Sequence, residues 1–308
     1  MTRRSLLCLL LFLLGLPPAL AQSKNGFDLR DALVPPAKIL HGGPPRDGIP
    51  AVDRPRFLAA AQAGLADDAR VLGIARNGVA KAYPIAILNW HEIVNDEFAG
   101  EPIVVTFCPL CGTGMAFRAE VGGQPRHFGV SGLLYNSDVL LYDRESESLW
   151  TQIGQRAISG PLRGTTLEAV PVAHTAWADW RTRHPHTLVL SSATGQVRDY
   201  ARDPYAGYAE SPAVWFPTDP FGSRYHPKER VLGLSLGGQS KAYPFVELAR
   251  LSGPLRDQFA GRSLTIEFDA GYGTARALDE TGEELPAVIA YWFAWSAFHP
   301  DGAVFRAP

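Results

Sequence analysis

The feature that most restricts the fold of this chain is a repeated segment. Fourteen residues from Val71 to Pro84 return as Val231 to Pro244, and eight of these positions are identical. A repeat of this length indicates one structural unit that occurs twice. We call the unit that begins near Val71 the first copy and the unit that begins near Val231 the second copy. Shorter matches continue downstream, at 98–100 with 259–261 and at 112–113 with 273–274.

Local patterns within the first copy predict short strands and few helices. Asn77-Gly78 is a tight-turn sequence between two apolar segments, which is typical of a β-hairpin. Pro84 suits the first turn of a helix, which we expect to extend to Ile93, and residues 175–183 predict a second helix. The sequence therefore predicts an α+β fold, strand-dominated and internally duplicated, with mixed or antiparallel sheets and few short helices.

A chain of 308 residues is at the size where a single core stops growing, so we expect more than one unit. Stretches rich in proline and glycine lie before the first copy and between the copies, and they indicate extended connections. The expected division is a signal peptide over 1–21, an extended Pro/Gly-rich arm over 22–60, a first unit carrying the Cys/His site over 61–200, a Pro-rich connection over 201–230 and a second, degenerate repeat unit over 231–308.

The N-terminal residues have the pattern of a signal peptide. Arg3 and Arg4 precede an apolar run, and the small residues Ala19 and Ala21 provide a cleavage site after Ala21. We therefore expect a periplasmic or secreted protein. The paired arginines leave both the general secretory route and the twin-arginine route open.

Composition and cysteine usage exclude several classes of protein. Lys+Arg 29 against Asp+Glu 31 gives no basic excess, so a nucleic-acid partner is not expected. No apolar run after the signal is long enough for a membrane span. Removal of the signal also removes Cys8, and the remaining Cys108 and Cys111 are too few for a disulfide scaffold.

Cys108 and Cys111 form a C-x-x-C sequence at the end of a predicted strand. This spacing brings two sulfurs to one point, where they bind a metal ion or form a disulfide. The second copy has Asp269, Tyr272 and Leu251 where the first has Cys108, Cys111 and His91. Because all three are replaced together, we infer that they serve one site.

We expect a mononuclear metal site with Cys108 and Cys111 as thiolate ligands and His91 as the imidazole ligand. Two soft sulfurs with one imidazole favour copper first and zinc second. His299 is the candidate for a fourth ligand. The sequence does not assign a reaction to this site, although redox chemistry is compatible with it.

Two alternatives remain open. In an exported protein, C-x-x-C also serves thiol-disulfide exchange with a redox partner. A non-catalytic binding module that presents aromatic residues is the second alternative, and it would keep its function without the cysteines. The partner is accordingly an unknown small molecule or a redox partner.

Further polar residues follow the same strands and are candidates for catalytic or supporting roles. Glu92 and Asp96 adjoin His91, where a carboxylate orients an imidazole or accepts a proton. Tyr135 and Asp138 belong to a polar segment that either lines the site or forms a hairpin turn.

Three of these segments resemble those of an exported bacterial family called domain of unknown function 3179. The resemblance extends over nearly the whole chain after the signal and implies a common fold and a common site, without an assigned reaction. The segments are 89–96 (NWHEIVND), 108–114 (CPLCGTG) and 132–138 (GLLYNSD).

Overall fold

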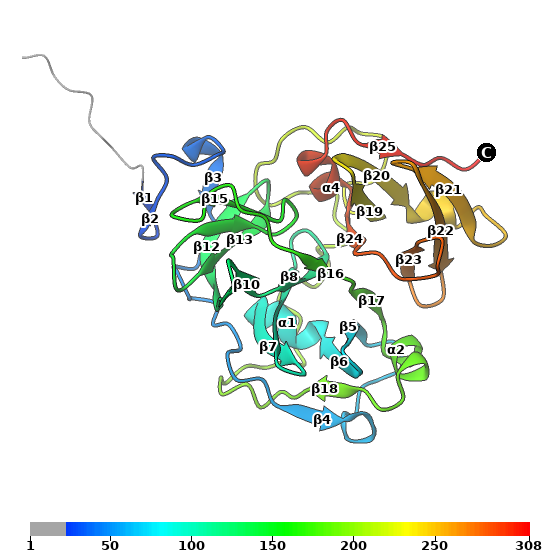
Figure 1. Cartoon of the computed structure of the whole chain (residues 1–308), viewed down its shortest axis with the longest axis horizontal. Coiled ribbons are helices and arrows are strands. Elements are labelled where there is room, and N and C mark those ends of the chain that lie inside the picture. Colours follow the sequence, from blue (N-terminus) through cyan, green and yellow to red (C-terminus); the bar gives the residue numbers. More distant parts are fainter. Residues whose placement is uncertain (1–22) are drawn as a thin grey trace, which may run out of the picture.

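The computed structural model describes residues 23–308, so the expected signal peptide lies outside the described residues. Strands predominate, helices are few and short, and the five larger sheets are arranged in a propeller-like ring (Figure 1). The strand-dominated fold with mixed and antiparallel sheets is confirmed, whereas the ring is a feature that the sequence did not predict. No helix within residues 23–308 is long and apolar enough to cross a membrane.

The repeated sequence forms the same hairpin in both copies. In the first copy Val71 pairs with Pro84, and in the second Val231 pairs with Pro244. Each hairpin has an antiparallel strand on one side and a parallel strand on the other. The β5 sheet contains β17 (Ala173–Ala176), β5 (Arg70–Arg76), β6 (Val79–Pro84), β18 (Leu188–Leu190) and β4 (Phe57–Ala59), and the β19 sheet contains β24 (Val288–Tyr291), β19 (Arg230–Leu236), β20 (Gln239–Pro244) and β25 (Ala303–Val304).

A helix leads from each hairpin to a second sheet of the same copy. The helices are α1 (Ile85–His91) and α3 (Phe245–Leu248). The β8 sheet contains β16 (Ala169–Val170), β9 (Thr113–Arg118), β8 (Glu101–Cys108) and β7 (Ile93–Phe98), and the β22 sheet contains β21 (Leu255–Phe259), β22 (Arg262–Asp269) and β23 (Thr274–Leu278).

The first copy also has a sheet without a counterpart in the second copy. It lies in the chain between β9 and β17, whereas β23 is followed by β24 in the second copy. We call it the β13 sheet, and its edge strand β3 comes from the N-terminal arm. Its members are β15 (Arg156–Ser159), β14 (Leu149–Thr151), β13 (Asp138–Asp143), β12 (Phe128–Tyr135) and β3 (Ile39–His41).

Three helix boundaries differ from the sequence-based expectation. Helix α1 ends at His91 and Ile93 begins β7, because Glu92 adopts a left-handed conformation (φ 57°) that terminates the helix. The second helix, α2 (Trp177–Arg183), begins later than expected because Thr175 belongs to β17. Pro84 lies at the N-cap rather than inside the first turn.

A glycine and a tryptophan explain one identity of the repeat. A Cβ atom at Gly73 would overlap the ring of Trp180 in α2, and one at Gly233 would overlap the ring of Trp295 in α4 (Trp292–Phe298). Both rings are almost fully buried. Only glycine permits this close packing of a helix on the central hairpin.

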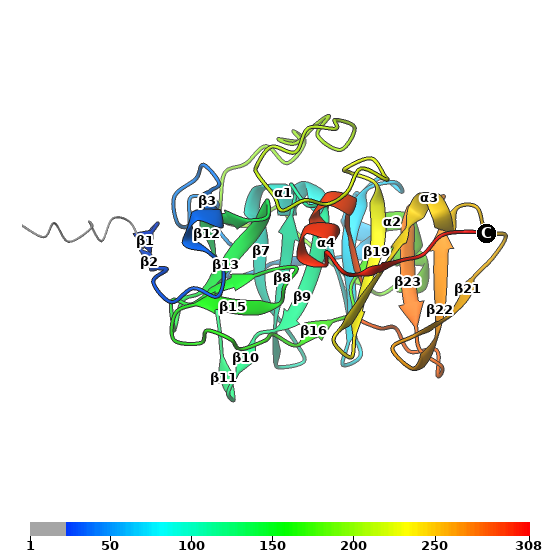
Figure 2. The ribbon, with the colours of Figure 1, turned by 90° about the horizontal axis from the view of Figure 1, so that it is seen from above.

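The two copies are connected by a segment without helix or strand, residues 191–229. It passes α1, where Asn89 Nδ2 donates to Asp203 Oδ1 and Trp90 Nε1 donates to Arg202 O (Figure 2). Its residues Tyr208 and Phe216 pack in the apolar cluster that contains both cysteines. The connection therefore covers part of the core.

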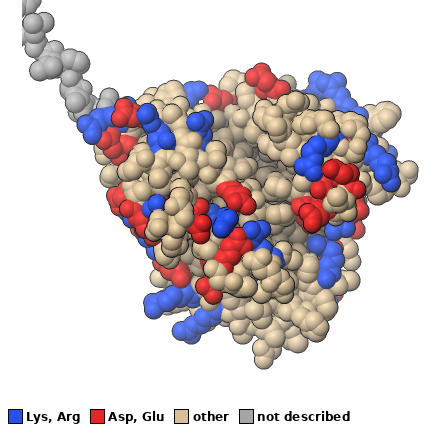
Figure 3. Space-filling view, viewed as in Figure 1, with Lys and Arg blue, Asp and Glu red and all other residues tan. Residues whose placement is uncertain are grey.

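Acidic and basic side chains are interspersed on the face of the molecule that Figure 3 shows.

The remaining short elements lie in the arm and in one hairpin. These elements are β1 (Ser23–Lys24), β2 (Phe27–Asp28), the 3-10 helices η1 (Pro36–Lys38) and η2 (Ala60–Gln62), and the pair β10 (Glu120–Val121) and β11 (Gln124–Pro125).

Candidate metal centre

The C-x-x-C loop joins β8 to β9. Cys108 is the last residue of β8, and Cys108 pairs with Thr113 at the start of β9. Gly112 closes the loop with φ 60°, and a Cβ there would lie 2.8 Å from the Tyr291 ring. The backbone N–H of Tyr291 donates to Cys111 O over 2.8 Å. Strand β24 of the second copy therefore supports this loop.

The facing residues come from the turn between β12 and β13. Asn136 (φ 52°) and Ser137 (φ 65°) are the only two residues between the paired Tyr135 and Asp138, so the turn is of the tight type with two left-handed residues. It directs the Ser137 carbonyl toward the sulfurs, which lie 3.3 Å (Cys111 Sγ) and 3.8 Å (Cys108 Sγ) from that oxygen. Asp138 follows as the first residue of β13.

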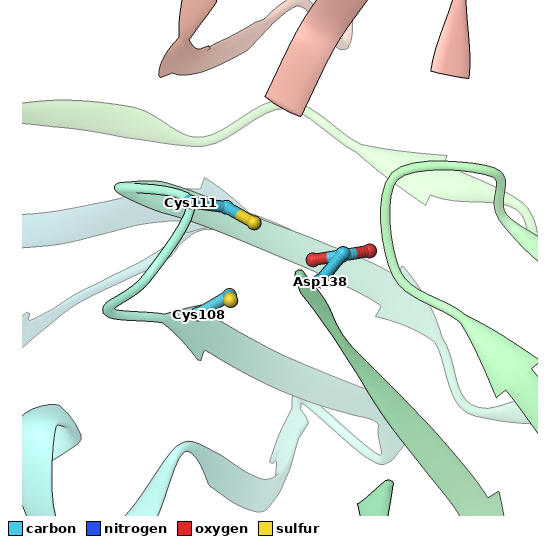
Figure 4. A group of neighbouring side chains, drawn as sticks. All are labelled: Cys108, Cys111 and Asp138. Carbon is cyan, nitrogen blue, oxygen red and sulfur yellow. The ribbon is translucent and has the colours of Figure 1, made fainter. Parts of the chain in front are cut away.

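Cys108, Cys111 and Asp138 meet in one buried group (Figure 4). Their candidate ligand atoms, the two Sγ and a carboxylate oxygen, all lie within 4.8 Å of one another. The backbone N–H of Ile153 donates to Asp138 Oδ2 over 3.0 Å, whereas Asp138 Oδ1 is buried without a hydrogen-bond partner. The arrangement therefore offers three donors to one central point.

Burial favours the protonated forms of all three groups, because it raises their pKa values. It raises the pKa of Asp138 to about 7, although the hydrogen bond from Ile153 acts in the opposite direction. It also raises the pKa of both thiols, since the two cysteines are 1% and 0% exposed. Anionic forms of these groups require a nearby positive charge.

Glu92 adds a fourth acidic group to this region. It is buried, and burial first and then the charge of Asp138 raise its pKa to about 8. Its main chain is held in place because Glu92 O accepts from the N–H of Phe107 on β8. No lysine, arginine or histidine within residues 23–308 forms an ion pair with Glu92 or Asp138.

Two tyrosines of the connecting segment pack near this group, and no sequence pattern pointed to them. Tyr208 is buried in the same apolar cluster as Cys108 and Cys111, and its hydroxyl has no hydrogen-bond partner. Burial, and next the neighbouring Cys111, raises the pKa of Tyr208. Tyr205 packs against the same cluster. These two side chains lie far from the C-x-x-C loop in the sequence.

His91, which the sequence placed with the cysteines, is not a member of the group of Cys108, Cys111 and Asp138. Its Nδ1 donates to Pro50 O over 2.7 Å, and its Nε2 accepts from the Tyr200 hydroxyl over 2.6 Å. Both ring nitrogens are therefore occupied by the N-terminal arm and the connecting segment. Asp138, rather than His91, is the third residue grouped with the two cysteines.

Asp96 also lies outside the group, because it is part of a buried ion pair. Lys81 Nζ lies 2.8 Å and 2.9 Å from the two carboxylate oxygens of Asp96, and Tyr83 Oη donates to the same carboxylate. The second copy repeats this arrangement with Lys241, Tyr243 and Asp257 at the equivalent positions. Asp96 is thus part of the repeated scaffold.

His299 and Tyr135 are not members of the metal-ligand group either. His299 follows α4 and packs against the ring of Trp295, with ring centroids 4.0 Å apart and planes tilted by 37°. His184 packs against Trp180 at 4.1 Å and 36° in the equivalent place of the first copy, so this contact belongs to the repeated fold. The ring of Tyr135 packs edge-on against Phe298.

Comparison with known families identifies the sequence. The family model described as "Protein of unknown function (DUF3179)" matches residues 46–302, which is most of the chain. The chain belongs to this family. The resemblance inferred from the sequence is thereby confirmed. No match was found among curated proteins, and none among solved structures.

The chemistry that this site could support depends on its three candidate ligand atoms, the two sulfurs and the carboxylate oxygen. Two thiolates and one carboxylate are ligands that zinc accepts, and three protein ligands leave one coordination position for water or a substrate. A divalent ion would also stabilise the deprotonated forms of these groups, which burial alone disfavours. Such a site can polarise a bound molecule or serve a purely structural purpose.

Proposed function

We propose that this chain is an exported, periplasmic protein whose function depends on a buried mononuclear metal site formed by Cys108, Cys111 and Asp138. The observation that carries the proposal is the convergence of these three buried donors within 4.8 Å. Buried acidic groups without a basic partner are costly, and a bound cation removes that cost.

The carboxylate changes the order of the candidate metals. With His91 as third ligand, copper would come first, since thiolate and imidazole are both good copper ligands. Asp138 is a harder oxygen ligand, and zinc accepts a mixture of thiolates and carboxylates. We therefore place zinc first and copper second.

The alternative of thiol-disulfide exchange fits the geometry less well. Reactive cysteines are partly exposed and have a lowered pKa, often at a helix N-terminus. Cys108 and Cys111 are instead buried with raised pKa values, and the loop leads into strand β9. The third alternative, a binding module without chemistry, would require no metal at all.

The test is the metal content and free-thiol count of protein purified from the periplasm without chelators or metal-affinity resin. We expect about one equivalent of zinc or copper per chain and its loss in Cys108→Ser. Absence of metal, together with two thiols that oxidise reversibly to a disulfide, would overturn the proposal in favour of exchange. Absence of metal with thiols that do not cycle would favour the binding module.

A further inference from the structure

A cavity of about 370 Å³ lies between helix α2 of the first copy and the β22 sheet of the second copy. It adjoins the end of β22 that corresponds to the C-x-x-C end of β8. Cys108 pairs with Thr113 in the first copy, and Asp269 pairs with Thr274 in the second. Asp269 and Thr274 both line the cavity. The second copy therefore has an open space beside the position that is equivalent to Cys108.

Four of the charged side chains that line this cavity form two ion pairs. Arg183 Nη2 of α2 lies 2.5 Å from Asp179 Oδ2, and Arg276 Nη2 of β23 lies 2.6 Å from Glu267 Oε2. All four side chains belong to the lining. Since each guanidinium already has a carboxylate partner, neither one is left to attract an anionic ligand.

Two further carboxylates line the cavity without a basic partner. Asp269 Oδ1 accepts from the N–H of Tyr272 in its own loop over 2.9 Å. Glu284 is partly exposed, and its side chain has neither an ion pair nor a hydrogen bond with any of residues 23–308. Burial raises the pKa of Glu284, although Arg183 and Arg276 act in the opposite direction. The lining therefore has an excess of negative charge.

The distribution of these groups favours an organic cation over a metal ion. Within residues 23–308, no three carboxylates of this cavity come together as a metal-ligand group. Much of the remaining wall is apolar. Because a cavity of about 150 Å³ holds benzene, this one has room for a ring with a short side chain. The apolar lining residues are Ala173, Leu248, Leu251, Pro254, Phe268 and Ala275.

We propose that this cavity binds a small primary amine, with its ammonium group at the carboxylate of Glu284 and its hydrocarbon part against the apolar wall. An ammonium group donates up to three hydrogen bonds and carries the positive charge that the lining lacks. A neutral molecule of the same size would leave the carboxylate uncompensated. This inference does not depend on the metal site, and it gives the second copy a binding role of its own.

The probe is 2-phenylethylamine, which is positively charged at pH 7, added to the full chain after signal removal. Its matched molecule is 2-phenylethanol, which has nearly the same size but no charge. Binding is measured by isothermal titration calorimetry at low ionic strength. We expect saturable binding of the amine with a Kd on the order of 1 mM, as befits so small a ligand. The alcohol should bind at least about fivefold more weakly, because it cannot form a charged hydrogen bond with Glu284.

Two neighbouring glutamates provide a variant and its matched control. Glu284→Gln keeps the size of the side chain but removes its charge, so it should weaken amine binding at least about fivefold. Glu283→Gln removes the same charge from the adjacent residue, which is exposed and does not line the cavity. The Kd of that variant should stay within about twofold of the unaltered chain, because charges at the exposed surface are screened. Thermal unfolding of both variants separates lost binding from lost folding.

The proposal is overturned if the amine gives no saturable binding at about ten times the expected Kd. It is overturned as well if the two variants weaken binding equally, because the amine would then respond only to the general negative charge of the surface. Equal binding of the amine and the alcohol would also contradict it, since the cavity would then recognise only the hydrocarbon part. This last comparison uses the unaltered chain, so it decides even if Glu284→Gln does not fold.

Discussion

The backbone N–H of Ile153 donates to Asp138 Oδ2 over 3.0 Å, while Asp138 Oδ1 has no hydrogen-bond partner. One oxygen is therefore held by the β13 sheet and its loop, and the other remains available beside the thiols. A carboxylate that is oriented by a backbone donor in this way resembles the supported ligands of metal sites, whose supporting contacts contribute to affinity.

The first prediction concerns this carboxylate. Asp138→Asn keeps an oxygen that can accept from Ile153 but removes the negative charge and the ligand, so the fold should persist while metal affinity falls. We expect the Kd for zinc to rise at least about tenfold, because even the loss of a residue that only supports a metal ligand has an effect of this size. The measurement is competition with a chromophoric chelator, together with the circular dichroism of the variant.

His91→Gln is the control for that experiment. Glutamine can donate to Pro50 O, and the imidazole lies outside the group of the three donors. Zinc affinity should therefore stay within about twofold of the unaltered chain, which is less than the effect of a lost supporting contact. A larger loss in His91→Gln than in Asp138→Asn would contradict the assignment of the third ligand and restore the sequence-based one.

The second prediction concerns the ion pair that both copies contain. In the first copy the side chains of Lys81 and Asp96 are 9% and 4% exposed. Lys81→Met leaves a buried carboxylate without its partner and should cost about 3–5 kcal/mol of unfolding free energy. The pair of Lys241 and Asp257 is more exposed (15% and 18%), so Lys241→Met should cost less. Urea unfolding followed by tryptophan fluorescence measures both.

A second substitution separates the lost charge from lost packing. Lys81→Met combined with Asp96→Asn removes the unpaired charge, and Tyr83 can still donate to the amide oxygen. The double variant should therefore recover part of the stability lost in Lys81→Met. If it is no more stable than the single variant, the loss does not arise from an uncompensated carboxylate.

The parts of the fold that depend on local sequence could be predicted. Asn77-Gly78 between two apolar segments specifies a hairpin and its register, and the observed pairing of Val71 with Pro84 agrees with it. The end of α1 was missed because Glu92 adopts the left-handed conformation without being glycine. The ring depends on contacts between the copies, which no local pattern describes.

The part of the candidate site that lies within one loop could also be predicted from the sequence, whereas the parts that come from other segments could not. The spacing of Cys108 and Cys111 was sufficient to bring two sulfurs together, since they share one loop. Asp138 could be named only as a neighbour, because its position depends on how the β13 sheet lies against β8. The contacts of His91 could not be predicted, because its partners Pro50 and Tyr200 come from distant segments. The arm and the connecting segment contact the first copy through His91. The presence of Leu251 at the equivalent position of the second copy can therefore be explained by these contacts, without a metal that His91 shares with the cysteines.

The third prediction is a pH dependence of stability. Burial lowers the pKa of His299 to about 4, below its ordinary 6.5. Above pH 6.5 both folded and unfolded chains hold a neutral imidazole. Between pH 6.5 and 4 the unfolded chain binds a proton that the folded chain does not, so stability falls as the pH falls. The loss from this group should reach about 3 kcal/mol by pH 4.

His299→Phe keeps a ring on Trp295 but cannot titrate, so it should reduce the loss of stability between pH 6.5 and 4. Urea unfolding at several pH values in this range measures the slope. His184→Phe is the comparison, because His184 makes the same ring contact in a less buried place and its pKa is also lowered by burial. An equal slope for His299→Phe and the unaltered chain would refute the proposed origin.

The last prediction tests why glycine recurs at the centre of both hairpins. Gly73→Ala places a methyl group against the Trp180 ring, and Gly233→Ala does so against Trp295. Each substitution should cost about 1–3 kcal/mol, because the helix must move away from its sheet. Gly253 has no heavy atom within 4 Å of an added Cβ and no left-handed conformation, so Gly253→Ala should leave the stability nearly unchanged. Thermal and urea unfolding measure all three variants. Equal stability of Gly73→Ala and Gly253→Ala would show that the close packing of Trp180 does not determine this position, and that the repeated glycine has another cause.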